Sequence, residues 1–218
     1  MAKKKRQRKE QVKTFANVSA EPRQFRGKWR EVFGNNGPMT LELGCGHGNY
    51  TLALAQHFPE KNFIGVDLKA ARIWVGAKAA LENQWRNVFF LNTNVWDLAE
   101  AFDAGEVAEI WIPFPDPYPK KPKKRLTAAR CLAVYQKICA PDARLHFKTD
   151  DDALYQSTLD ALDEFGCTIL RNIADVYAEP ELDDDLRIQT SYEKRHLAAG
   201  KTIKYVQFTL PSTGESYD

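Results

Sequence analysis

Blocks of hydrophobic and polar residues alternate along this chain from residue 39 onward. Short apolar runs are separated by longer stretches compatible with helices, and the runs lie at Met39 to Leu43, Phe63 to Val66, Val88 to Leu91 and Val107 to Ile112. Apolar runs of this length between polar turns are typical of buried strands. Because strands and helices alternate, the pattern predicts a mostly parallel central sheet with helices on both faces.

The second half of the chain extends this sheet. The pattern predicts a strand at Arg144 to Phe147, a helix at Asp151 to Phe165 and a strand at Cys167 to Leu170. Residues Lys201 to Leu210 alternate in polarity and predict a final, antiparallel strand. The expected architecture is therefore a Rossmann-like α/β fold with about seven strands.

The N-terminal segment has a different composition from the rest of the chain. Six of its first nine residues are cations, Lys3, Lys4, Lys5, Arg6, Arg8 and Lys9, with almost nothing apolar to bury. Self-repulsion and lost chain entropy predict a disordered tail over residues 1–25, either solvated or in contact with RNA phosphates. With 218 residues and 44% hydrophobic content, residues 26–218 suffice for a single domain.

Composition also narrows the class of protein. The four cysteines form no Cys-x-x-Cys pair and the four histidines show no metal-ligand spacing, so we expect a reduced cytoplasmic protein without a metal site. No apolar run is long enough to span a bilayer, and the basic start lacks the apolar stretch of a signal peptide. The net charge of +2 does not by itself indicate nucleic acid. The sequence leaves both a monomer and a homodimer open.

A glycine-rich turn follows the first predicted strand. Gly44, Gly46 and Gly48 alternate with Cys45 and His47, and a helix is expected to begin at about Asn49. Glycine permits backbone angles closed to other residues and lets a ligand approach the backbone. Asp67 ends the next strand, where an acid can accept hydrogen bonds from both ribose hydroxyls. This layout is typical of a nucleoside-binding fold, although a purely structural turn has the same local sequence.

Two details favour S-adenosyl-L-methionine over a dinucleotide as the nucleoside. Asn49 replaces the third glycine of the dinucleotide pattern, and Glu42 stands on the strand just before the turn. A carboxylate there repels a pyrophosphate and attracts a cofactor that carries an ammonium and a sulfonium. Asn94, just after the third strand, is placed either to bind the adenine edge or as an ordinary turn residue.

The segment from Ile112 to Arg125 combines prolines with an acid, an aromatic ring and five cations. Proline stiffens the backbone, and the loop follows a strand at the carboxyl edge of the sheet, where open α/β sheets bind ligands. We expect Asp116 to hold a splayed base and Tyr118 to stack near it, with phosphates on Lys120, Lys121, Lys123, Lys124 and Arg125. The alternative is a proline-rich connector with a solvated basic face.

Four motifs in order carry a family resemblance. They are Leu-Glu-Leu-Gly-Cys-Gly at Leu41 to Gly46, Phe-Pro-Asp-Pro-Tyr-Pro-Lys-Lys at Phe114 to Lys121, Phe-Lys-Thr-Asp at Phe147 to Asp150, and Thr-Ser-Tyr-Glu at Thr190 to Glu193. Together they resemble the bacterial tRNA (guanine-N7-)-methyltransferases, from about Leu41 to Gly200. The resemblance implies a class I methyltransferase fold, S-adenosylmethionine as cofactor, and a guanosine in the variable loop of tRNA as target.

The resemblance also implies residue roles. Glu42, Asp67, Asn94 and Asp116 are expected in the cofactor pocket with the three glycines, and the substrate is expected to contact Lys120, Asp150, Thr190, Ser191, Tyr192 and Glu193. From the residues alone, Asp150 is equally a helix N-cap, and Thr190 with Glu193 a local capping box. The basic loop after Lys121 is about two residues shorter than is usual in the family, which leaves the choice of tRNAs open.

Guanine N7 carries a lone pair and no proton, so attack on a sulfonium methyl needs no obligatory general base. Asp116 is the predicted catalytic residue, because a carboxylate beside the base orients it and stabilises the cationic product. Alternatives are methylation of an exocyclic amino group, since Asp-Pro-Tyr partly resembles the Asp-Pro-Pro-Tyr motif of amino-methyltransferases, a non-catalytic RNA-binding protein of this fold, and a dehydrogenase.

Overall fold

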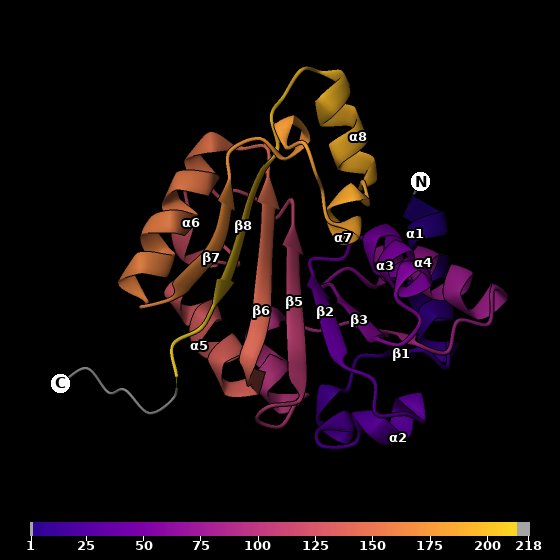
Figure 1. Ribbon diagram of the computed structural model, residues 1–218. Helices are drawn as coiled ribbons and strands as arrows, with labels where there is room; N and C mark the ends of the chain where they lie inside the picture. Colours follow the sequence, from indigo (N-terminus) through magenta and orange to yellow (C-terminus); the bar gives the residue numbers. More distant parts are fainter. Residues whose placement is uncertain (1, 213–218) are drawn as a thin grey trace.

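The computed structural model describes residues 2–212 and contains one eight-stranded sheet in this part of the chain (Figure 1). The strand order across it is β1-β4-β3-β2-β5-β6-β8-β7. The strands are β1 (Val18–Ser19), β2 (Met39–Leu43), β3 (Asn62–Val66), β4 (Val88–Leu91), β5 (Val107–Pro113), β6 (Cys139–Thr149), β7 (Thr168–Ile173) and β8 (Lys204–Thr209). Neighbours from β1 to β6 are parallel, and β8 runs antiparallel between β6 and β7, which confirms the predicted final strand.

Helices cover both faces of the sheet, as predicted. One hydrophobic cluster includes side chains from α2, α5 and α6, and a second includes side chains from α3, α4 and α7. The helices are α1 (Ala2–Gln11), α2 (Trp29–Phe33), α3 (Asn49–His57), α4 (Ala70–Glu82), α5 (Ala129–Ile138), α6 (Asp152–Glu164), α7 (Asp184–Arg187) and α8 (Ser191–Ala198). Every residue of the central strands β2, β3 and β4 is buried, which explains why they read as continuous apolar runs.

The prediction of a disordered tail is wrong for residues 2–25. After α1, Val12 is 2% exposed, and β1 adds an eighth strand by pairing with β4. The guanidinium of Arg8 lies 4.5 Å from the ring centre of Trp74, and the Asn17 side chain donates to the Ala77 carbonyl at 3.0 Å. A few apolar side chains and one stacked arginine therefore anchor a segment whose charge suggested disorder. Its first residue lies outside the described part.

No helix in residues 2–212 has both the length and the apolar character that crossing a membrane requires.

Candidate functional site

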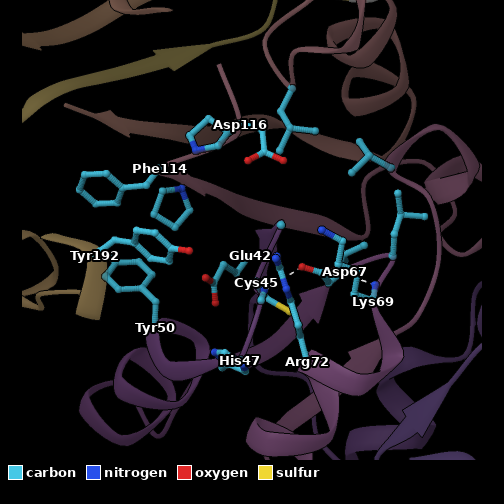
Figure 2. Close-up of a pocket in the computed structure, with 18 of the residues that line it drawn as sticks. Glu42, Cys45, His47, Tyr50, Asp67, Lys69, Arg72, Phe114, Asp116 and Tyr192 are labelled. Carbon is cyan, nitrogen blue, oxygen red and sulfur yellow. Dashed lines mark hydrogen bonds between the residues drawn. The ribbon is translucent and has the colours of Figure 1, made fainter. Parts of the chain in front are cut away.

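A cavity of about 560 Å3 opens at the carboxyl ends of the central strands (Figure 2). Its lining comes from the glycine turn after β2, the end of β3, the segment after β4, the proline-rich loop after β5, and the start of α8. Crevices at this edge of open α/β sheets are the usual ligand sites of the fold. Segments far apart in the sequence thus meet where the sequence predicted a site.

The glycine turn divides into two roles. Gly44, Gly46 and Gly48 all have positive φ, at 74°, 57° and 72°. A Cβ on Gly44 would meet nothing closer than Leu126 at 3.8 Å, and Gly46 is equally open, so both present bare backbone to the cavity. Gly48 does not line the cavity but faces the core, where an added Cβ would lie 2.7 Å from the Phe90 ring. Gly48 is therefore needed for close packing of the turn against Phe90.

Glu42 lies in the cavity wall and also caps a helix. It is 5% exposed, and one carboxylate oxygen accepts hydrogen bonds from the Thr51 backbone N–H at 2.7 Å and from the Thr51 hydroxyl. Thr51 belongs to the first turn of α3, where a carboxylate satisfies free N–H groups. Burial raises the pKa of Glu42 to about 7 despite these hydrogen bonds. A cationic ligand group beside it would favour its ionised form.

Asp67 and Asn94 each accept hydrogen bonds from backbone N–H groups of turns beside the cavity. Asp67 accepts from the Gly46 N–H at 2.9 Å with one oxygen and from the Lys69 N–H at 2.7 Å with the other. Asn94 accepts from the Trp96 N–H at 3.1 Å and caps a 3₁₀ helix. Both residues line the cavity. The turn and pocket readings of Asn94 are therefore compatible.

The proline-rich loop presents Asp116 and Tyr118 to the cavity. Phe114 and Tyr118 have positive φ, at 51° and 42°, which is uncommon for bulky residues and often found at functional sites. Arg125 was expected on phosphates, but it donates to the Pro117 carbonyl at 2.8 Å and to the Ser157 hydroxyl at 2.7 Å. Arg125 therefore braces the loop.

The cations of this loop lie mostly on its outer side. Lys120 and Lys121 are exposed and do not line the cavity, whereas Lys124 is exposed and does. They are placed for a large polyanion, and less so for a small ligand in the cavity.

The Thr190 to Glu193 motif forms the start of α8. Thr190 accepts from the Glu193 N–H at 3.0 Å, and the Glu193 carboxylate accepts from the Thr190 N–H at 3.2 Å, which is the capping box. Thr190 lines the cavity, as does Tyr192 (Figure 2), and the Tyr192 side chain is exposed. Glu193 does not, because it is fully buried. The side chain of Ser191 lies outside what the structure describes.

Asp150 is also outside the cavity lining. Its carboxylate contacts His196 Nδ1 at 3.0 Å and Lys201 Nζ at 2.5 Å. The N-cap of α6 is its neighbour Asp151, which accepts from the Leu154 N–H at 2.7 Å. Asp150 is therefore not the helix cap, and its expected contact with substrate stays a prediction.

Sequence reasoning missed several residues of the cavity wall. Tyr50 follows the glycine turn on α3, Lys69 and Arg72 lie where α4 begins, and Arg195 lies one helical turn after Tyr192. The Arg195 guanidinium lies 5.3 Å from the Tyr192 ring centre. A signal existed for Arg195, since residues three apart on a helix share a face. The cationic residues at the start of α4 carried no motif.

A cluster of potential metal ligands lies elsewhere, where Glu109, His146 and Asp185 bring ligand atoms within 4.8 Å of one another. Glu109 lies 3.0 Å from His146 Nε2 and 2.9 Å from Lys61 Nζ. Burial disfavours its ionisation, but these two neighbours outweigh burial and lower the pKa of Glu109 to about 2. Tyr205 contacts His146 Nδ1 at 2.7 Å. Glu109 therefore forms ion pairs with Lys61 and His146 at this cluster.

The fold and the site define a class. A family model described as "Putative methyltransferase" matches residues 36–206. The structure is similar to the 16S rRNA methyltransferase KamB, with a TM-score of 0.65 and 16% identity over 85% of this chain and 94% of that one. It is also similar to a 16S rRNA (adenine(1408)-N(1))-methyltransferase from Catenulisporales acidiphilia, with a TM-score of 0.59 and 14% identity over 87% and 93%. The fold is that of class I methyltransferases.

Sequence relatives narrow the class to one family. The chain is 42% identical to a tRNA (guanine-N(7)-)-methyltransferase of Bacteroides thetaiotaomicron, covering 92% of this chain and 80% of the relative. It is 46% identical to the enzyme of the same name from Porphyromonas gingivalis, covering 85% and 77%. The chain belongs to the tRNA (guanine-N(7)-)-methyltransferase family.

Proposed function

We propose that this protein transfers the methyl group of S-adenosylmethionine to N7 of a guanosine in the variable loop of tRNA. The observation that carries the proposal is the cavity itself, which brings Glu42, Asp67 and Asp116 together at the carboxyl edge of the sheet. Membership of the family supports the choice of base and of RNA.

The residues present fit the cofactor. A cavity of about 560 Å3 is within the range of about 300–1,000 Å3 usual for small-molecule sites. The open backbone at Gly44 and Gly46 leaves room for close approach, and the buried carboxylate of Glu42 suits a cationic ligand. Asp67 would hold the ribose hydroxyls with its remaining lone pairs, and Asn94 the adenine edge.

On the RNA side, the exposed cations Lys120, Lys121, Lys123 and Lys124 follow Asp116 on the same loop. Such a row attracts the phosphate backbone without reading sequence. Tyr118 and Tyr192 lie at the cavity with 37% and 55% of their surface exposed, and exposed rings are suited to stacking on a base.

The cofactor supplies an electrophilic methyl group, and the chain supplies orientation and charge. Asp116 is exposed at the cavity, where its carboxylate would accept hydrogen bonds from guanine N–H groups and leave N7 free to attack. Methylation makes the purine cationic, so the same carboxylate stabilises the charge that develops. Because N7 has no proton to lose, no residue needs to act as a base.

The test incubates the protein with methyl-labelled S-adenosylmethionine and unmodified tRNA, then identifies the labelled nucleoside. Wild type should yield 7-methylguanosine, and Asp116→Asn should lose about 100-fold or more in kcat/KM with its fold intact. Asp163→Asn, at an exposed position of α6, is the matched control and should behave as wild type. Label in another nucleoside would overturn the base assignment, and an active Asp116→Asn would remove Asp116 from the mechanism.

A further inference from the structure

The end of β6 holds α8 and the segment after it at three contacts. Lys148 Nζ lies 2.5 Å from the Glu193 carboxylate, and both side chains are fully buried. Two residues further along, Asp150 contacts His196 of α8 at 3.0 Å and Lys201, just after α8, at 2.5 Å. α8 carries cavity residues at its start, and these contacts connect it to the end of β6 and to Asp150, the residue after the strand.

Lys148 also holds the proline-rich loop. Its backbone carbonyl accepts from the Phe114 N–H at 2.8 Å, where the loop leaves β5 with φ of 51° at Phe114. The Phe114 ring lies nearly parallel to the His196 ring, with centres 6.4 Å apart. The two walls of the cavity, loop and helix, are thus both connected through this residue of β6.

The Glu193 carboxylate, which pairs with Lys148, also accepts hydrogen bonds from other residues. Glu193 accepts from the Tyr177 hydroxyl at 2.8 Å and closes the capping box with Thr190. Burial lowers the pKa of Lys148, and the charge of Glu193 opposes that shift. A buried pair of this kind contributes little net stability, because desolvation offsets the attraction, whereas removing one partner leaves an uncompensated buried charge.

We propose that Lys148 is a positioning residue for methyl transfer, which sets α8 against the proline-rich loop so that Thr190, Tyr192 and Arg195 face the cavity. This inference rests on the proposed function and deepens it. It gives Glu193 the role of partner to Lys148 instead of contact to substrate. Lys148 does not line the cavity, so it acts through α8 and the loop.

The proposal predicts that loss of Lys148 affects the use of tRNA but not the binding of S-adenosylmethionine. The cofactor-side residues Glu42, Asp67 and Asn94 belong to the other half of the cavity wall, around β2 to β4, and their hydrogen bonds do not involve Lys148. Displacing α8 should therefore spare cofactor affinity and impair use of tRNA. Phosphate contacts by the basic loop remain, so kcat should fall more than KM rises.

The experiment compares Lys148→Met, Glu193→Gln and their double variant with wild type. Each single variant should lower kcat/KM for tRNA at least about tenfold, mainly through kcat, and leave the Kd of S-adenosylmethionine within about twofold. The double variant should lose no more than the worse single variant, because the two residues act as one pair. Lys137→Met, at an exposed position of α5, is the matched control.

Two results would overturn the proposal. One is a folded Lys148→Met protein with wild-type kcat/KM for tRNA, and the other is a loss that parallels cofactor affinity. If the unpaired Glu193 prevents Lys148→Met from folding, the double variant, which buries no unpaired charge, decides the question by the same comparison of kcat, KM and Kd. Failure of the proposed function is distinguishable, because wild type would then make no 7-methylguanosine.

Discussion

Replacing Glu42 with Gln should stabilise the cofactor-free protein and weaken cofactor binding. Burial raises the pKa of Glu42 from 4.5 to about 7, so the folded state retains a proton that the unfolded state releases between those pH values. A raised carboxyl pKa therefore lowers stability as pH rises through this window. From these two values the loss between pH 5 and pH 8 is about 2.5 kcal/mol. Gln carries no such charge and keeps an oxygen for the Thr51 N–H.

The assay is urea unfolding of wild type and Glu42→Gln at pH 5 and pH 8. The unfolding free energy of Glu42→Gln minus that of wild type should increase by about 2.5 kcal/mol from pH 5 to pH 8. Glu164→Gln, at the exposed end of α6, should show no such shift. A difference that stays constant with pH to within about 0.5 kcal/mol would refute the assignment of a buried, destabilising carboxyl at this position.

Cofactor binding should have the opposite pH dependence. An ionised Glu42 attracts a cationic ligand, so the Kd of wild type should fall about tenfold between pH 5.5 and pH 7. Glu42→Gln should bind more weakly at pH 7 and lose most of this dependence. Calorimetric titration measures both. Equal Kd values for the two proteins at pH 7 would show that Glu42 acts only as the cap of α3.

Two further substitutions test other parts of the site. Gly48→Ala should lower the free energy of unfolding in urea by more than about 2 kcal/mol, because a Cβ would lie 2.7 Å from the Phe90 ring. The control Gly105→Ala, with positive φ but open surroundings, should lower it by only about 1 kcal/mol. Equal losses for the two variants would contradict the packing role of Gly48. Tyr192→Ala should leave unfolding within about 0.5 kcal/mol of wild type and lower kcat/KM for tRNA about tenfold, and unchanged methylation kinetics would exclude stacking by this ring.

The sequence alone determined the central strands of the sheet, the glycine turn and several polar residues of the cavity wall. Buried parallel strands are continuous apolar runs, and a turn against a ligand needs glycine. Both features can therefore be recognised from short stretches of sequence. Glu42, Asp67, Asn94 and Asp116 were expected at the cavity because each lies near or just after the carboxyl end of a strand, and the fold brings these strand ends together.

Only the tertiary structure decided which polar side chains face the cavity. Asp150, Glu193 and Arg125 look like ligand contacts in the motifs, yet each is engaged by partners remote in sequence, such as Lys201 for Asp150 and Lys148 for Glu193. The basic N-terminal segment likewise acquires structure from β4 and α4. Hydrogen bonds and ion pairs between distant residues depend on the packed arrangement, and no local pattern encodes them.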